Sequence, residues 1–284
     1  MSPIAIGNLM LKLFLIRIAH QIKLFIPPII WSFTRKYFMP DSPQVFEGEY
    51  SSLSKVKERG YNTSDSLENS YNETLRELND YKHLNPPQKS NSHNPIANLL
   101  PLVAALVGHK KEISILDFGG GMGRSYLRCL SALQDSNISI DYHIVDLEDT
   151  IEYAMKIYPD NMDVHFYRDI PDTLKDVDIV YLGSTLQYIN AYEALIQRLA
   201  KLEPKYFFLT DYFTSPSQTF ATAQVNMKDR RIAYWIFNLR EIVGIVEQQG
   251  YKKIYETKNH QPIYNFSNAH IIDDSCNLLF SRDK

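Results

Sequence analysis

A glycine-rich turn constrains the fold of this chain more than any other feature of its sequence. Residues 113–118 form a short apolar run, four of the next five residues are glycine, and residues 126–133 have the spacing of a helix. A glycine-rich turn between a strand and a helix is typical of open α/β sheets, which bind ligands beyond the carboxyl ends of their strands. We therefore expect residues 113–133 to be the first strand, turn and helix of such a sheet.

Apolar runs and helical segments alternate through the remainder of the chain. Further strands are expected at 141–146, 164–167, 178–182 and 206–210. Helices are expected at 70–81, 95–107, 150–158, 191–202 and 232–249. The alternation predicts a parallel sheet covered by helices on both faces. Two final strands, at 252–257 and 277–281, are joined by a loop and can pair antiparallel.

The first forty residues differ in charge from the rest. They carry five basic and no acidic side chains, whereas the remaining residues carry 25 basic and 33 acidic ones. Lys12, Arg17 and Lys23 interrupt every apolar window long enough to span a membrane, and no small-x-small cleavage site of a signal peptide follows. The pattern predicts a basic amphipathic helix that lies on an anionic membrane surface. The alternative is a helix that docks on its own protein or on a second subunit.

Charge and cysteine content exclude several classes of function. The net charge of −3 and pI of about 6.2 argue against a nucleic-acid partner. Cys129 and Cys276 are far apart and lack ligand spacing, so we expect no disulfide framework and no structural zinc site. No carboxylate and histidine cluster with ligand spacing stands out either, so no metal is expected. A reducing, cytoplasmic setting fits best.

Three kinds of ligand site compete for the glycine turn. A phosphate-binding P-loop needs a lysine after its closing glycine, and this turn has none at that spacing. A dinucleotide turn needs a third glycine where this chain has Arg124. The pattern acid-x-Gly-x-Gly-x-Gly of an S-adenosylmethionine (AdoMet) site is matched by Asp117, Gly119, Gly121 and Gly123. A purely structural turn is the remaining alternative.

Acidic residues after the next two strands extend this predicted cofactor site. Asp146 directly follows the second strand, where a carboxylate can accept hydrogen bonds from both ribose hydroxyls. Glu148 competes for that role, although an acid at this point also suits a helix N-terminus. Asp169 and Ile170 follow the third strand, where they could meet the adenine amino group and ring. An ordinary turn aspartate before Pro171 is the alternative.

Together these motifs resemble the class I AdoMet-dependent methyltransferases over about residues 95–284. A narrower likeness, to a family of methyltransferases encoded in bacterial capsule and lipopolysaccharide gene clusters, extends over nearly the whole chain. Its pieces are Pro27-Pro28, residues 46–50, Gly60-Tyr61, residues 116–121, Val145-Asp146-Leu147, residues 184–188, Gln224 and residues 234–238. The resemblance implies an α/β, Rossmann-like seven-stranded sheet with a reversed C-terminal hairpin. It also implies that Leu147 and Ser184 contact the cofactor.

Methyl transfer requires alignment of acceptor, methyl group and sulfur, and a hydroxyl acceptor benefits from a general base. Asp211, at the end of the fifth strand, is the first candidate for that base. Tyr212 and the pair Gln187-Tyr188 are candidates for the acceptor pocket, with packing as the alternative. His93, Gln224 and Asn226 are weaker candidates. His165 lies within a strand and is expected to be a core or surface histidine.

The sequence thus predicts a membrane-proximal segment at 1–40, a helical cap at 41–94 and a methyltransferase domain at 95–284. The expected enzyme O-methylates a sugar or glycan intermediate of surface polysaccharide synthesis, with AdoMet as cofactor, at the cytoplasmic face of the inner membrane. Two alternatives stay open. One is a methyltransferase that acts on a small molecule or a lipid. The other is a catalytically silent AdoMet-fold partner of polysaccharide enzymes.

Overall fold

The computed structural model describes nine stretches of the chain, which belong to a compact unit that begins at Gln44. These stretches are residues 45–60, 63–83, 99–107, 111–159, 162–226, 229–259, 263–264, 271–272 and 275–282. The amphipathic helix predicted within residues 1–40 and the candidate His93 lie outside the described residues. Within the described stretches, no helix combines the length and the apolar character that a membrane span requires.

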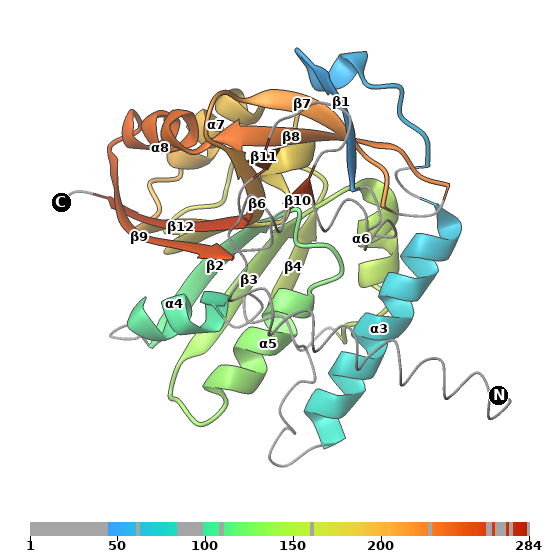
Figure 1. The fold of residues 1–284 in the computed structure, drawn as a ribbon. Helices are drawn as coiled ribbons and strands as arrows, with labels where there is room; N and C mark the ends of the chain where they lie inside the picture. The colour runs from blue at the N-terminus through green and yellow to red at the C-terminus, as the bar shows by residue number, and fades with distance from the viewer. Residues whose placement is uncertain are drawn as a thin grey trace, which may run out of the picture. The chain divides into compact units, whose positions relative to one another are not determined.

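Seven strands of one sheet carry the fold (Figure 1). In chain order they are β2 (Glu112–Phe118), β3 (Ser139–Val145), β4 (Val164–Tyr167), β5 (Ile179–Gly183), β6 (Tyr206–Ser215), β9 (Tyr251–Asn259) and β12 (Ser275–Arg282). Their spatial order is β4-β3-β2-β5-β6-β12-β9. The first five are parallel, and β12 runs antiparallel to both β6 and β9. The Rossmann-like sheet with a reversed C-terminal hairpin is therefore confirmed.

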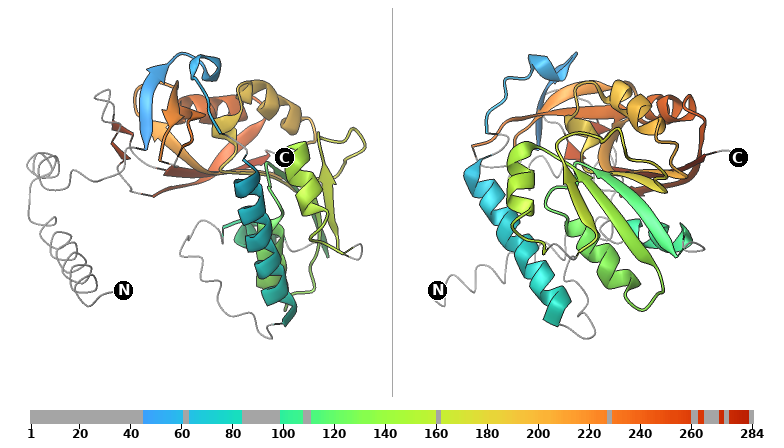
Figure 2. Two further views of the ribbon diagram at one scale, coloured as in Figure 1. Left: turned by 90° about the vertical axis from the view of Figure 1, so that its right-hand side faces the viewer. Right: turned by 180° about the vertical axis from the view of Figure 1, so that it is seen from behind.

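Helices cover both faces of this sheet (Figures 1 and 2). One face packs against α3 (Ser64–His83), α4 (Leu99–Val107), α5 (Arg124–Leu133) and α6 (Glu148–Ala154). The other packs against α7 (Tyr192–Ala200) and α8 (Leu239–Glu247). Successive strand residues divide between the two cores: Ile179 and Tyr181 face the first, whereas Val180 and Leu182 face the second. This alternation follows from the pleat of a strand.

A small antiparallel sheet continues from the carboxyl end of β6. It consists of β1 (Phe46–Tyr50), β7 (Phe220–Gln224) and β8 (Ile232–Asn238), and β8 joins β6 where Thr214 pairs with Phe237. Two short strands, β10 (Ile263–Tyr264) and β11 (Ile271–Ile272), form a separate pair. The segment expected to be a helical cap thus contains the strand β1 as well as the predicted helix, which is α3.

The helix predicted at 232–249 is wrong in its first part. All seven residues of β8 are buried, as a strand covered on both faces requires, and the strand pairs with β7. Asn238 then separates strand from helix, because its side-chain oxygen accepts hydrogen bonds from the backbone N–H groups of Arg240 and Glu241. This is an N-cap, so α8 begins only at Leu239. The apolar residues continue from β8 into α8, so their pattern did not indicate where the strand ends and the helix begins.

The strand order creates a switch point beside β2. The chain leaves β2 toward β3 on one side, and the later strand β5 lies on the other side. Ligands of open α/β sheets bind beyond the carboxyl ends of the strands at such a point. The predicted glycine turn stands at that end of β2.

Candidate functional site

The glycine loop after β2 takes its shape from three left-handed residues. Gly119, Gly121 and Gly123 have φ values of 75°, 59° and 83°, which glycine adopts without steric cost. A Cβ added at Gly119 would collide with the Thr185 side chain, and one at Gly123 would lie 2.7 Å from the hydroxyl of Tyr158. A Cβ at Gly121 would meet no described atom within 4 Å. A Cβ at Gly120 would collide with Asp117, so the loop is packed at these three glycines and open at Gly121.

Asp117 lies beneath the loop and not on its open side. Only 1% of the residue is exposed, and its carboxylate accepts a hydrogen bond of 2.8 Å from the Tyr142 hydroxyl. Burial raises the pKa of Asp117 to about 7, against the lowering effect of that hydrogen bond. A Cβ added at Gly120 would lie 2.7 Å from a carboxylate oxygen of Asp117, so the carboxylate packs against the backbone of the loop. Its predicted contact with a cofactor amino group stays a prediction.

Asp146 connects the loop with the end of β3. One carboxylate oxygen accepts a 2.8 Å hydrogen bond from the N–H of Gly121, and the other accepts a 2.7 Å bond from the N–H of Leu147. Leu147 is 52% exposed, which is unusual for a large apolar side chain. A carboxylate, an open glycine and an exposed apolar side chain thus lie next to one another, as the predicted cofactor site requires.

A second group of predicted residues gathers at the ends of β5 and β6. Ser184 and Asp211 both have left-handed backbones, with φ values of 57° and 59°. The Ser184 hydroxyl donates a 2.7 Å hydrogen bond to the Asp211 carboxylate. The buried Asn277 accepts a 3.0 Å bond from the Asp211 N–H, and the Gln187 amide donates to the Asp211 carbonyl. These bonds hold a carboxylate and a hydroxyl in fixed positions.

Tyr188 extends this second group toward the small sheet. Its hydroxyl donates a 3.0 Å hydrogen bond to the side-chain oxygen of Gln224 on β7, and its ring packs edge-on against Tyr234. Both Tyr188 and Gln224 are partly exposed. Asn226, two residues after Gln224, is exposed. The structure therefore brings Tyr188 and Gln224 together, as the predicted acceptor pocket requires.

Tyr212 is placed differently. Only 1% of it is exposed, its ring packs edge-on against Phe237, and its hydroxyl has no hydrogen-bond partner among the described residues. Burial raises the pKa of Tyr212 far above its ordinary value. The side chain lies in the core that α7 and α8 cover and does not join Ser184 and Asp211. Its predicted catalytic role is not supported by this position.

Asp169 and Ile170 form a third, separate group. Arg198 of α7 holds the Asp169 carboxylate with two hydrogen bonds, of 2.6 and 3.0 Å. This guanidinium lowers the pKa of Asp169 below its ordinary value. Ile170 is 6% exposed and packs in the core beside Val145. The predicted contacts of this pair with adenine stay a prediction.

Three residues that sequence reasoning missed connect the groups. The Thr185 hydroxyl, after β5, donates to the carbonyls of Gly119 and Gly183 at 3.3 and 3.1 Å, and so joins the two strand ends. Tyr142 supports Asp117, and Asn277 supports Asp211. Their roles depend on strand register, which no local motif encodes.

Arg124, which argued against a dinucleotide turn, is the first residue of α5. Its guanidinium forms ion pairs with Glu73 at 2.9 Å and Glu77 at 2.5 Å, both on α3. These contacts tie α3 to the helix that follows the loop.

The sequence and the structure were compared with those of known proteins. No family model matches the chain, and no curated protein matches it in sequence. One similar solved structure is a SAM-dependent methyltransferase from Methanosarcina mazei, with 13% identity, 61% of this chain and 93% of that chain covered, and a TM-score of 0.46. Another is the 1,6-didemethyltoxoflavin-N1-methyltransferase of Burkholderia thailandensis, crystallised with S-adenosylhomocysteine (11% identity, 81% and 94% covered, TM-score 0.46).

A third similar structure is the magnesium protoporphyrin IX methyltransferase of Synechocystis with bound SAH (12% identity, 78% and 100% covered, TM-score 0.48). All three similarities are distant. The function proposed below therefore rests on the geometry of this chain.

Proposed function

We propose that this chain is an AdoMet-dependent methyltransferase. The observation that carries the proposal is the open Gly121, whose N–H is bonded to the Asp146 carboxylate at the switch point of the sheet. Gly119 and Gly123 are needed for packing, because a side chain there would collide, and Gly121 suits its left-handed backbone. Of these three positions, only Gly121 also has free space where a side chain would lie. That space lets a ligand approach the backbone closely.

The residues around Gly121 fit the parts of AdoMet. The Asp146 carboxylate has the charge and position to accept hydrogen bonds from ribose hydroxyls. The exposed Leu147 offers an apolar contact for the adenine ring. When bound, AdoMet supplies an electrophilic methyl group on a positively charged sulfur. The residues at the ends of β5 and β6, Ser184 and Asp211, would then be available to an acceptor of that methyl group.

The second group of residues supports a hydroxyl-bearing acceptor. Ser184, Asp211, Tyr188 and Gln224 present hydroxyl, carboxylate and amide groups, which pair with the hydroxyls of a sugar. Asp211 is the residue able to receive the proton that an acceptor hydroxyl loses, a role typically worth about 10²–10⁴-fold in rate. Together with the family resemblance, this favours O-methylation of a sugar or glycan intermediate.

Transfer of labelled methyl groups tests the activity and its acceptor class. The full chain is incubated with methyl-labelled AdoMet and, separately, with nucleotide sugars, lipid-linked glycans or unrelated small hydroxy compounds. We expect label in the glycan fractions and loss of at least 99% of turnover in Asp211→Asn, with AdoMet affinity unchanged. Label only in the small compounds would contradict the glycan assignment. Unaltered turnover in Asp211→Asn would contradict its role as base.

We also propose, from sequence alone, that the basic residues 1–40 bring the enzyme to an anionic membrane and hence to lipid-linked acceptors. Co-sedimentation with vesicles tests this. The full chain should sediment with vesicles that contain anionic lipid and not with neutral ones, and deletion of residues 1–40 should abolish the difference. Equal sedimentation of both forms would contradict it.

A further inference from the structure

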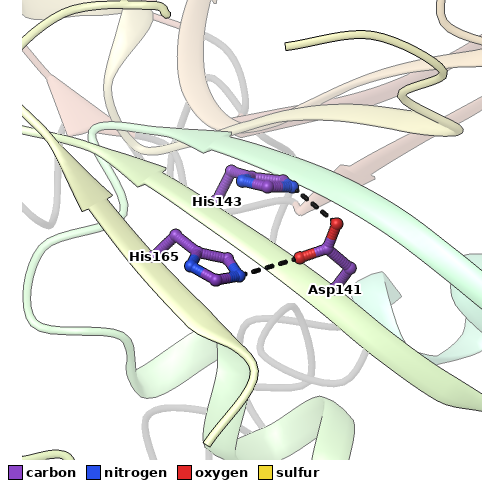
Figure 3. Close-up of side chains that lie close together, drawn as sticks. All are labelled: Asp141, His143 and His165. Atoms are coloured by element: carbon purple, nitrogen blue, oxygen red, sulfur yellow. Dashed lines mark hydrogen bonds and ion pairs between the residues drawn. The ribbon is translucent and has the colours of Figure 1, made fainter. Parts of the chain in front are cut away.

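Two histidines and an aspartate meet on the sheet, away from the site described above (Figure 3). Asp141 and His143 lie on β3, two residues apart and hence on the same face. His165 lies on β4 and pairs in register with His143. The two imidazole rings stack with their centroids 5.1 Å apart. Strand pairing thus brings His165 to two side chains that precede it by more than twenty residues in sequence.

The three side chains converge on one point. The Nε2 atom of His143 lies 2.9 Å from one oxygen of Asp141, and the Nε2 atom of His165 lies 3.1 Å from the other. One ligand atom from each residue fits within a span of 4.8 Å. Zinc binds nitrogen and oxygen at about 2.0–2.2 Å, which puts neighbouring ligand atoms of a tetrahedral site about 3.3 Å apart. The two nitrogen–oxygen distances are within about 0.4 Å of this spacing, and the 4.8 Å span would have to shorten for all three atoms to bind one cation.

The surroundings of His143 are those of a metal ligand. Its second nitrogen, Nδ1, lies 3.3 Å from the Tyr167 hydroxyl, and a hydrogen bond on the far nitrogen is the usual device that orients a ligating imidazole. The His143 side chain is only 7% exposed. Asp141 and His165 are 35% and 48% exposed, which leaves a path from solvent.

The fold leaves this part of the sheet accessible. The described connection between β4 and β5, residues 168–178, contains turns but no helix. The first described α-helix after β5 is α7, which packs in the core with strands nearer the centre of the sheet. A cation at this point would thus join the outermost parallel strand to its neighbour and keep its remaining coordination positions in solvent.

We propose that Asp141, His143 and His165 form a binding site for a divalent transition-metal cation of the zinc class. Two imidazole nitrogens and one carboxylate oxygen favour zinc and its neighbours over magnesium or calcium, which prefer oxygen ligands alone. Bound metal would cross-link β3 and β4, the strands that lead to Asp146 and Asp169. Since both strands must be paired for the ligands to meet, the cation would stabilise the native sheet.

Calorimetric titration with zinc chloride tests the site. Tag-free full-length protein is freed of metal with a chelator and titrated with Zn²⁺ or, separately, Mg²⁺, and its melting temperature is followed in parallel. His165→Ala removes a half-exposed ligand and Asp141→Asn keeps the shape of its side chain, so both variants should fold. We expect either change to weaken this Zn²⁺ binding at least tenfold and to remove the Zn²⁺-dependent rise in melting temperature.

The matched control is His83→Ala, which removes a histidine at the end of α3 and should leave Zn²⁺ binding unchanged. This control matters because the chain has 8 histidines. Zinc binding that survives His165→Ala at full affinity would overturn the proposal. So would Mg²⁺ binding of equal strength, or no binding of Zn²⁺ by the wild-type protein.

Discussion

The two predicted halves of the site both contain residues with a left-handed backbone, but they use different residue types at those positions. After β2, the left-handed positions are glycines, which adopt this conformation at no steric cost. After β5 and β6, they are Ser184 and Asp211, for which each left-handed residue costs about 1–3 kcal/mol. Hydrogen bonds from Ser184 to Asp211 and from Asp211 to Asn277 offset part of that cost.

This difference indicates which groups each half of the site offers to a ligand. The glycine loop presents backbone, and a side chain in its middle would occupy the space for a ligand. The Ser184–Asp211 pair presents side chains, so the chain keeps them despite the strained backbone. We interpret the first half as the cofactor side and the second as the acceptor side, and the substitutions below test this distinction.

The largest expected effect is that of Gly119→Ala. The new Cβ would collide with the Thr185 side chain and would hold a left-handed φ of 75°, so we expect a loss of about 2–4 kcal/mol in the free energy of unfolding. Urea denaturation measures it. Gly250→Ala is the matched control, because its φ is 85° and nothing lies within 4 Å; it should lose only about 1–2 kcal/mol. Equal losses would show that Thr185 does not support the loop.

The second prediction concerns pH and Asp117. Its folded pKa of about 7 is above the ordinary value of 3.8, so the wild-type protein should lose stability as pH rises from about 4 to 7, by roughly 2–4 kcal/mol. Asp117→Asn keeps an acceptor for Tyr142 but does not titrate, so this contribution should vanish. Urea denaturation at a series of pH values measures it. An unchanged pH dependence in the variant would contradict the buried position of Asp117.

Ser184→Gly should have a smaller effect. Glycine relieves the left-handed strain but removes the hydrogen bond to Asp211, which is worth about 0.5–1.5 kcal/mol. The exposed Asp176 has nearly the same φ, 56°, so Asp176→Gly measures the relief of strain alone. We expect Ser184→Gly to be less stable than that control by about 1 kcal/mol. Equal stability of the two variants would show that the hydrogen bond between Ser184 and Asp211 does not stabilise the protein.

The smallest effect is expected for Arg198→Ala. The ion pair with Asp169 is largely exposed to solvent, so its contribution should be at most about 1 kcal/mol. Because Arg198 lowers the folded pKa of Asp169, the contribution is present above about pH 4 and is lost as the pH falls through the folded pKa. Thermal melts at pH 3 and pH 7 measure it. A larger loss at pH 3 than at pH 7 would contradict this sign.

The sequence predicts the half of the site that depends on local chemistry. The glycine loop, the acid after β3 and the alternation of strands and helices are all encoded within short segments, and each is found where it was predicted. The antiparallel C-terminal hairpin is confirmed as well, because only a loop separated its two apolar runs.

Features that depend on pairing were not predictable in the same way. Residues 232–238 are buried on both sides, so their apolar pattern did not distinguish strand from helix. Tyr212 follows Asp211 directly, yet the left-handed backbone of Asp211 interrupts the register between β6 and β12, and Tyr212 lies in the core. His143 and His165 meet only because β3 and β4 pair in one register.

Binding of AdoMet tests the central claim most directly. Wild-type protein is titrated by calorimetry with AdoMet, S-adenosylhomocysteine and NAD, beside Gly121→Ala, Asp146→Asn and the control Gly250→Ala. Asp146→Asn keeps an acceptor for the Gly121 N–H but loses the charge. We predict saturable binding of the two sulfur nucleosides, at least tenfold weaker in both site variants and unchanged in the control. Absence of such binding in folded wild-type protein, or binding of NAD in its place, would contradict the account.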